Sequence, residues 1–187
     1  FQAGRVHRFF AISKTVEGRS DYFPEEALVT SIHHPTFTKV TSYDGPKDLI
    51  VTASRLESPK RVDLLIDAYI QSGVTLPFWI IGDGPAVNQL KEKANAHPGI
   101  VFKEKLSEEE LVAAYQRALF VPFVPKQEDY GLITVEAFLA GAAVLTTSDS
   151  GGPTELVRHQ ESGWIASPSV ESLAEGFRAL AGNSDQT

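Results

Sequence analysis

The stretch "LFVPFVPKQEDYGLITVEAFLAGAAVLTT" (residues 119–147) contains two short apolar runs on either side of a helical pattern. The runs at 119–125 and 143–147 are apolar on both faces, which is typical of strands that helices cover from both sides. The pattern at about 131–140 predicts an α-helix between them. A strand, a helix and a second strand joined by short turns indicate a βα unit of a parallel sheet.

The same alternation of strand-like and helical segments extends outward from this stretch. Strand-like runs lie at 49–54, 77–82, 100–102 and 163–166, and the other helical patterns lie at 59–72, 85–97, 107–118, 152–159 and 170–182. We therefore predict an α/β fold, a Rossmann-like parallel sheet with helices on both faces. Ligands of such sheets bind at the carboxyl ends of strands and at helix N-termini.

The first 48 residues have a different pattern. Residues 8–13 and 27–32 are strand-like and surround a short helical segment at 14–22. Residues 33–48 are rich in Pro, Gly, Thr and Ser without periodicity, and we interpret them as a linker or surface loop.

Composition limits the classes of function that are open to the chain. A net charge of −7 over 187 residues argues against a general nucleic-acid binder. The absence of Cys excludes disulfides and thiolate chemistry. No apolar run reaches the ~18 residues that a membrane span needs. Because the sequence lacks Met even at position 1 and shows no signal peptide, we expect an excised or processed piece.

Glu136 lies at the centre of the helix predicted at 131–140. On a helical wheel it falls between Leu132 and Leu139 on one side and Ile133 and Ala140 on the other. A carboxylate on an apolar stripe is costly to bury unless it is hydrogen-bonded or paired. Two explanations are open, a structural Glu with a protein donor and a Glu that accepts from ligand hydroxyls.

Glu128 lies eight residues earlier, just after the strand-like run. Between the two acids, the backbone N–H groups of Tyr130, Gly131 and Leu132 form the predicted helix N-terminus, which attracts phosphate. A sugar or ribose hydroxyl near each carboxylate, with phosphate on the amides between them, would explain this arrangement.

A cationic cluster is expected at residues 54–61, "SRLESPKR". Ser58 is a predicted N-cap and Pro59 the first helical residue. Lys60 and Arg61 then lie in the first turn, where the helix dipole disfavours positive charge, and Arg55 lies just before them. A bound anion would account for the cluster, and so would ion pairs with neighbouring carboxylates.

Two glycine turns lie at the ends of predicted strands, "IGDGP" (81–85) and "SGGP" (150–153). Each permits a close approach of the backbone to a ligand. Each is also an ordinary turn sequence, so both interpretations stay open.

Together these segments resemble a family, the C-terminal donor-binding half of GT-B glycosyltransferases of the family 4 type, "glycosyl transferases group 1". The resemblance covers about residues 49–180. The segments that carry it are "ASRLESPKRVDLLIDAY", "WIIGDGPAVNQL", "KLSEEELVAAYQRA", "PKQEDYGLITVEAFLAGAAVLTT" and "SGGPTELVRHQESGW". The spacing of Glu128 and Glu136, that of Arg55 and Lys60, and the Gly-Gly segment form a joint signature.

The resemblance implies a role for each matching position. The residues assigned to catalysis are Arg55 and Lys60, which would hold the donor diphosphate, and Glu128, which would contact the transferred sugar. The residues assigned to donor binding are Gly82, Lys105, Leu106, Tyr130, Gly131, Leu132 and Glu136. Among these, Lys105 and Leu106 would form the edge of the pocket for the nucleotide base, and Glu136 would bind the ribose. Glu104 stands where relatives usually have Gly, so the backbone at the base pocket differs.

The resemblance also implies an activity, transfer of a hexose from a nucleoside diphosphate sugar to an acceptor with retention of configuration. No metal and no cofactor are expected. Residues 1–27 would be the last strand and helix of an N-terminal acceptor domain, and 28–187 the nucleotide-sugar-binding domain. We expect the isolated chain to bind donor and to transfer poorly, because a missing domain would bind the acceptor.

The wider setting implied is cell-envelope polysaccharide or glycoconjugate synthesis in the cytoplasm, at the inner face of the membrane through peripheral association. No nucleic-acid partner is expected. His33, His34 and Pro35 would lie near the junction of the domains, and we interpret the histidines as part of a solvated linker. A nucleotide-sugar epimerase or phosphorylase on the same fold and a non-catalytic nucleotide-binding module are the alternatives.

Overall fold

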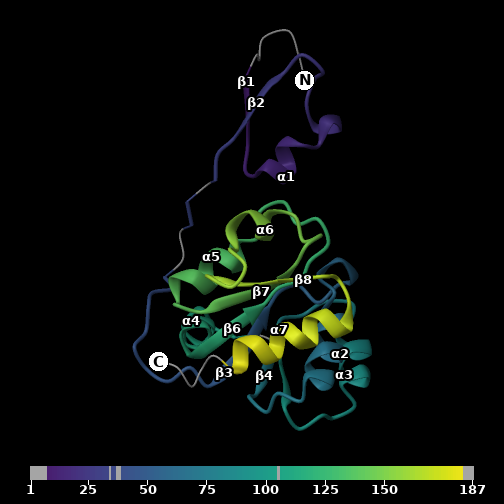
Figure 1. The fold of residues 1–187 in the computed structure, drawn as a ribbon, viewed down its shortest axis with the longest axis vertical. Helices are drawn as coiled ribbons and strands as arrows, with labels where there is room; N and C mark the ends of the chain where they lie inside the picture. The colour runs from purple at the N-terminus through teal and green to yellow at the C-terminus, as the bar shows by residue number, and fades with distance from the viewer. Residues whose placement is uncertain (1–7, 34, 37–38, 105, 183–187) are drawn as a thin grey trace.

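The computed structural model describes residues 8–33, 35–36, 39–104 and 106–182. Its main body is a six-stranded sheet in the order β5-β4-β3-β6-β7-β8, with every neighbouring pair parallel (Figure 1). The strands are β3 (Leu49–Ala53), β4 (Phe78–Ile81), β5 (Ile100–Lys103), β6 (Ala118–Pro122), β7 (Ala143–Thr147) and β8 (Gly163–Ala166). The strand order reverses between β3 and β6, and the predicted α/β fold is confirmed.

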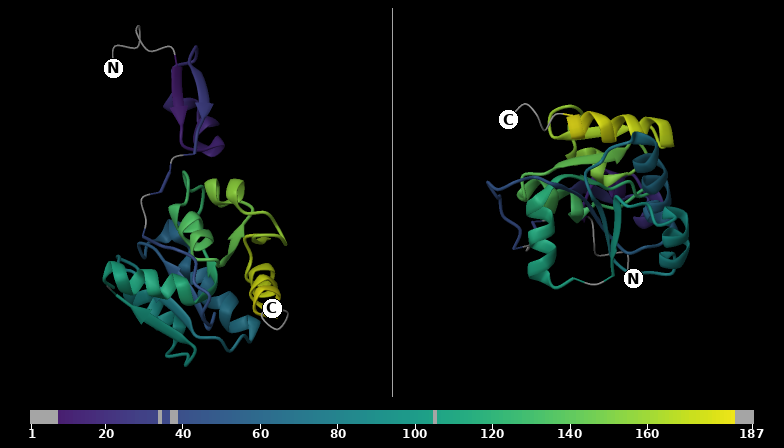
Figure 2. Two further views of the ribbon diagram at one scale, coloured as in Figure 1. Left: turned by 90° about the vertical axis from the view of Figure 1, so that its left-hand side faces the viewer. Right: turned by 90° about the horizontal axis from the view of Figure 1, so that it is seen from below.

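Helices cover both faces of this sheet (Figures 1 and 2). One face packs against α2 (Val62–Ser72), α3 (Val87–Ala94) and α7 (Val170–Gly182), and the other against α4 (Glu108–Arg117) and α5 (Leu132–Leu139). Because side chains alternate along a strand, Ile50 joins the core under α2 and α7 while its neighbour Val51 joins the core under α4 and α5. The strands are therefore buried on both sides, as their apolar runs predicted.

Local sequence explains where several helices begin and end. Ser107 and Glu110 form a capping box at the start of α4, in which each side chain accepts from the other residue's backbone N–H. Gly73, in the left-handed conformation, ends α2. These boundaries lie within two residues of the predicted ones.

The start of α2 differs from the prediction. Residues Ser58–Lys60 form a short 3-10 helix, η3, and the α-helix begins only at Val62. Ser58 makes no side-chain cap, and Arg61 takes a left-handed conformation with φ 50° between the two helices. The prediction of one helix from Pro59 is wrong because the side chain of Arg61 is held by distant partners, which are described below.

The N-terminal residues form a separate unit with its own parallel sheet, β1 (Arg8–Ala11) and β2 (Leu28–Ser31). Between these strands lie α1 (Lys14–Glu17) and the 3-10 helix η2 (Ser20–Tyr22), so the two predicted strands and the helical segment are confirmed. The change from this sheet to the six-stranded one falls after β2, later than the expected boundary at 27/28. Figure 1 shows α1 next to α6 (Gly152–Leu156) of the main body.

The described part of the segment between the two sheets has no regular element until β3, as the linker interpretation predicted. It is nevertheless anchored, because Val40 is buried in the core under α4 and α5. The Lys47 Nζ also donates to the Ala140 carbonyl at 2.6 Å. Among the described helices, none has the length and apolar character to cross a membrane.

Candidate functional site

The loops that follow β3, β6 and β7 meet at one edge of the sheet and carry most of the predicted site residues. Backbone hydrogen bonds join them. The Lys126 N–H donates to the Pro59 carbonyl at 2.8 Å, and the Glu128 N–H donates to the Ser150 carbonyl at 2.9 Å. The carboxyl ends of these strands therefore form one continuous surface at the point where the strand order reverses.

Lys60 and Glu128 are brought together from positions far apart in the sequence. The Lys60 Nζ lies 2.6 Å from Glu128 Oε2, and the two side chains are 19% and 26% exposed. The ammonium also lies 5.7 Å from the centre of the Phe123 ring. Two of the three residues assigned to catalysis are thus in contact in a partly buried position.

Arg55 stands apart from this pair. Its side chain is 71% exposed, and its Nε lies 3.3 Å from Glu57 Oε2. The neighbouring Ser54 hydroxyl is buried and has no hydrogen-bond partner among the described residues. An exposed ion pair of this kind contributes roughly 0–1 kcal/mol, so the Arg55 side chain can change partner at small cost.

Gly82 and Gly84 allow the loop after β4 to lie against the loop after β3. Gly82 has φ 137°, and a Cβ there would come within 2.0 Å of the Ser54 carbonyl oxygen. A Cβ on Gly84 would come within 2.3 Å of the Leu56 carbonyl oxygen. The structure supports the turn interpretation of "IGDGP" and places Gly82 directly behind Ser54, at the site edge.

The start of α5 has no side-chain cap. Gly131, with φ 85°, is the N-cap residue, and Leu132 begins the helix with a side chain that is 41% exposed. Uncapped N–H groups at a helix start attract anions. Gly152 packs directly on the preceding residue, since a Cβ there would lie 2.5 Å from the Tyr130 Cα. Close backbone packing therefore explains the Gly-Gly segment.

Tyr130 is 6% exposed, and burial raises the pKa of its hydroxyl. Its ring lies 5.4 Å from the His33 ring, and His33 Nε2 lies 3.5 Å from Glu155 Oε2. His33 is 43% exposed and lies in the segment after β2, in agreement with the linker interpretation, but it also contacts the main body. His34 lies outside the described residues.

Glu136 faces the hydroxyl of Tyr115 on α4, which influences its pKa. Burial raises the pKa of Glu136, and the Tyr115 hydrogen bond opposes this shift. Burial, with the nearby Glu136 carboxylate, raises the pKa of Tyr115 well above its usual value. Tyr115 is thus a candidate protein donor, and the lone pairs of the carboxylate also suit ligand hydroxyls, so both explanations of Glu136 stay open.

The helical wheel of α5 was correct in part. Leu132 and Leu139 are each 41% exposed, whereas Thr134 and Ala137 are buried. The buried face is centred nearer Ala137, so Glu136 lies at its border. Because α5 is almost wholly apolar, its sequence does not indicate clearly which face of the helix packs on the sheet.

The predicted base-pocket edge is described in part. Leu106 packs against the core that contains Tyr115, on the same face of the sheet as Glu136. Lys105 lies outside the described residues. Glu104, at the position where a glycine was expected, has its Oε1 2.5 Å from the Nζ of Lys91.

Arg61 is the functional-site residue whose role the sequence misassigned. Its guanidinium binds both oxygens of Asp149 at 2.8 Å and the Thr147 hydroxyl at 2.7 Å. It also donates to the carbonyls of Val124 at 2.7 Å and Pro125 at 2.9 Å. Arg61 is thus a clamp between three loops and not part of an anion-binding cluster. Its partners lie more than 60 residues away in sequence, so no local pattern indicates them.

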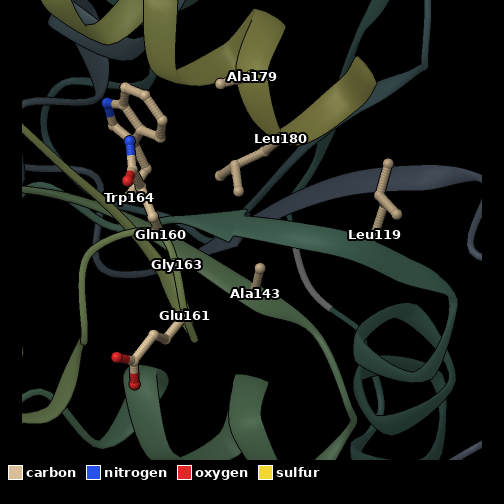
Figure 3. A pocket seen from close by; sticks show the side chains of 8 residues that line it. All are labelled: Leu119, Ala143, Gln160, Glu161, Gly163, Trp164, Ala179 and Leu180. Atoms are coloured by element: carbon tan, nitrogen blue, oxygen red, sulfur yellow. The ribbon is translucent and has the colours of Figure 1, made fainter. Parts of the chain in front are cut away.

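Among the described residues, two of the cavities lie at opposite ends of the strands of the sheet. A polar cleft of about 450 Å³ separates α1 from the loops of the site. Its lining residues are Lys14, Thr15, Gly18, Arg19, Gln127, Ser148, Asp149, Gly151 and Thr154. The other, of about 480 Å³, is bounded by the starts of β6, β7 and β8, by Trp164 and by the end of α7 (Figure 3), and no predicted site residue lines it.

Within the described ranges, no group of three or more His, Asp or Glu side chains is placed to hold a metal ion.

Comparison with known proteins assigns the chain to a family. The family model described as glycosyl transferases group 1 matches residues 35–186. The chain belongs to the glycosyl transferases group 1 family. This group 1 glycosyltransferase domain also resembles solved GT-B structures, among them Anabaena Alr3699/HepE in complex with UDP and glucose. That likeness has a TM-score of 0.78 at 19% identity and covers 97% of this chain and 55% of the other, and it confirms the GT-B fold.

The chain spans only a part of the length of two curated relatives that it matches. The exopolysaccharide phosphotransferase SCO2592 of Streptomyces coelicolor is 32% identical to the group 1 domain over 144 residues. The human alpha-1,3/1,6-mannosyltransferase ALG2 is 21% identical over 152 residues. These alignments cover 72% and 71% of this chain but only 15% and 36% of the two relatives.

Proposed function

We propose that this chain is the donor-binding half of a glycosyltransferase that takes a hexose from a nucleoside diphosphate sugar and transfers it to an acceptor. The proposal includes retention of configuration and independence of metal and cofactor. The observation that carries it is the partly buried pair of Lys60 and Glu128 beside the uncapped start of α5. A cation, a hydroxyl acceptor and a helix start without a side-chain cap in one place match a sugar diphosphate.

The diphosphate is assigned to Lys60, Arg55 and the amides of Tyr130, Gly131 and Leu132. An ammonium has three N–H donors, so its bond to Glu128 leaves two for phosphate oxygens. Arg55 is exposed and loosely paired, which lets it turn toward a bound anion. Positive charge and helix amides held in place would stabilise the charge that grows on the departing diphosphate.

The hydroxyls of the donor are assigned to the two glutamates. Glu128 contacts Lys60 through Oε2, which leaves Oε1 to accept from a hydroxyl of the transferred sugar. Glu136 lies near the Tyr115 hydroxyl, and its carboxylate has lone pairs for the ribose hydroxyls. The base is assigned to the edge formed by Leu106 and Lys105, with Gly82 at the donor side of the neighbouring loop.

The acceptor is assigned to a domain continuous with the N-terminal unit. Several large apolar side chains of this unit are exposed, namely Phe10, Ile12, Tyr22, Leu28 and Ile32. Exposed apolar surface of this extent favours packing against further chain. Under this proposal the 187-residue chain binds donor and transfers poorly, and peripheral contact with the cytoplasmic face of a membrane comes from the acceptor domain.

A role in cell-envelope polysaccharide or glycoconjugate synthesis is supported by the names of the relatives, an exopolysaccharide enzyme and a mannosyltransferase. The group 1 domain aligns with a small part of the first, so its phosphotransferase activity is not carried over. A nucleotide-sugar epimerase and a non-catalytic nucleotide-binding module are the alternatives.

Calorimetric titration of the chain with UDP, GDP and ADP tests the donor site. We expect one base to be preferred and Lys60→Ala to weaken its binding at least about tenfold, which is 1.4 kcal/mol. Lys93→Ala is the matched control, because Lys93 pairs with Asp67 at 2.7 Å on the other side of the fold. No binding to the wild-type chain at millimolar nucleotide, or equal binding by Lys60→Ala, would contradict the proposal. Product analysis with the full-length protein separates transfer from epimerisation.

A further inference from the structure

The N-terminal unit holds the loop that carries Glu128. Arg19 Nη1 lies 2.6 Å from Asp129 Oδ1, and Arg19 Nη2 donates to the Gln127 carbonyl at 2.8 Å. The Ser13 hydroxyl donates to the Asp129 carbonyl. Both residues that flank Glu128 are therefore bound by side chains more than 100 positions earlier in the sequence.

Gln127 needs such support. It has φ 50°, the left-handed region that residues with a Cβ adopt at a cost in free energy. Its N–H donates to the Asp149 carbonyl at 3.0 Å, and its own carbonyl accepts from Arg19. The Glu128 N–H also donates to the Ser150 carbonyl at 2.9 Å, so Arg19 adds a side-chain bond to a backbone that the loop after β7 already holds. Since Glu128 follows directly, its side chain depends on this conformation.

The position of Arg19 is in turn set by α6. The Glu155 carboxylate accepts from the backbone N–H groups of Lys14 at 2.9 Å and Thr15 at 2.8 Å, and from the Thr15 hydroxyl at 2.7 Å. It thereby caps the start of α1. The N-terminal unit is thus attached to the main body at two points, α6 and the Glu128 loop.

We infer that Arg19 is a positioning residue for the donor site, through which the N-terminal unit keeps the Glu128 loop in its left-handed conformation. This inference rests on the proposed function, because it assigns the consequence to donor binding. The donor site then responds to the docking of the N-terminal unit, which carries neither Lys60 nor Glu128. Any movement that separates Arg19 from Asp129 and Gln127 would loosen the loop and weaken donor binding.

The test uses the full 187-residue chain with Arg19→Ala and Arg19→Lys. The control is Arg117→Ala, because Arg117 also pairs with an aspartate, binding both oxygens of Asp48 at 2.9 and 2.7 Å, and lies away from the donor site. Amide hydrogen exchange of residues 126–132 is measured without ligand, and UDP, GDP and ADP are then titrated into each variant.

We expect Arg19→Ala to raise exchange at 127–130 on the order of tenfold and to weaken nucleotide binding by about the same factor. Arg19→Lys keeps the positive charge but loses the forked geometry of the guanidinium, so its exchange rate and its nucleotide affinity should lie between those of the wild type and Arg19→Ala. Arg117→Ala should match the wild type in both measurements. Unchanged exchange in Arg19→Ala would overturn the inference, as would raised exchange with unchanged nucleotide affinity. No nucleotide binding by the wild type would overturn the proposed function, while the exchange data would still decide whether Arg19 holds the loop.

Discussion

Replacing Arg61 tests whether one side chain holds the site loops together. Arg61 is 17% exposed and donates five hydrogen bonds, two to Asp149 and one each to Val124, Pro125 and Thr147. Breaking a fully buried ion pair costs about 3–5 kcal/mol, and the 36% exposure of Asp149 lowers that figure. We expect Arg61→Ala to lower the free energy of unfolding by about 3 kcal/mol.

The backbone of Arg61 supplies an internal control. Its φ of 50° is strained for Ala and free for Gly. Arg61→Gly removes the same five hydrogen bonds but relieves about 1 kcal/mol of left-handed strain. It should therefore be more stable than Arg61→Ala, by about 1 kcal/mol. Arg117→Ala, which breaks an exposed arginine pair with Asp48, should cost no more than about 1 kcal/mol.

Urea denaturation measures these differences, and for a chain of this size about 3 kcal/mol corresponds to a melting temperature roughly 6–12 °C lower.

Hydrogen bonds from Arg61 hold the pKa of Asp149 below its ordinary value of 3.8. The resulting stability is present above pH 3.8 and is lost as the pH falls through the folded pKa. The difference in free energy of unfolding between the wild type and Arg61→Ala should therefore become smaller at acid pH. If Arg61→Ala lowers the free energy of unfolding by less than about 1 kcal/mol at pH 7, Arg61 does not hold the loops together. An Arg61→Gly variant that is less stable than Arg61→Ala would also contradict this reasoning.

Three further changes have defined outcomes. Gly152→Ala should lower the free energy of unfolding by about 2–3 kcal/mol in urea denaturation, because its Cβ would lie 2.5 Å from the Tyr130 Cα. Burial raises the pKa of Glu136 above its ordinary 4.5. The contribution of the Glu136 carboxyl group to folding stability is therefore fully present below pH 4.5 and is lost as the pH rises through the folded pKa. Glu136→Gln should therefore match the wild type near pH 4 and melt at a higher temperature at neutral pH; an unchanged difference across pH would contradict this. Glu155→Gln should weaken the cap of α1 by about 1 kcal/mol, seen as faster exchange at the Thr15 amide, and unaltered exchange would show that the carboxylate charge is dispensable.

The alternation of apolar runs and helical patterns predicted the fold because strands buried on both faces leave a strong signal in sequence. Ile50 and Val51 are both fully buried, on opposite faces. The capping box at Ser107 and Glu110 and the glycine that ends α2 are equally local. Where neighbours in sequence decide the structure, the prediction was correct within a few residues.

The site was predicted less completely, because its contacts are non-local. Lys60 and Glu128 were placed at the same edge of the sheet from their positions after strands, but their contact follows only from the packed loops. Arg61 was grouped with Lys60 by charge, whereas Asp149 binds it. The Tyr115 hydroxyl that influences the pKa of Glu136 comes from another helix, and no spacing within α5 indicates it.

A crystal structure of this chain with the nucleoside diphosphate that it binds best tests the central claim most directly. We predict phosphate oxygens within hydrogen-bonding distance of Lys60 Nζ and the amides at the start of α5, with the ribose hydroxyls at Glu136. A nucleotide bound elsewhere, for example in the cavity beside Trp164, with Lys60 and Glu128 still paired only to each other, would contradict the assignment of the donor site.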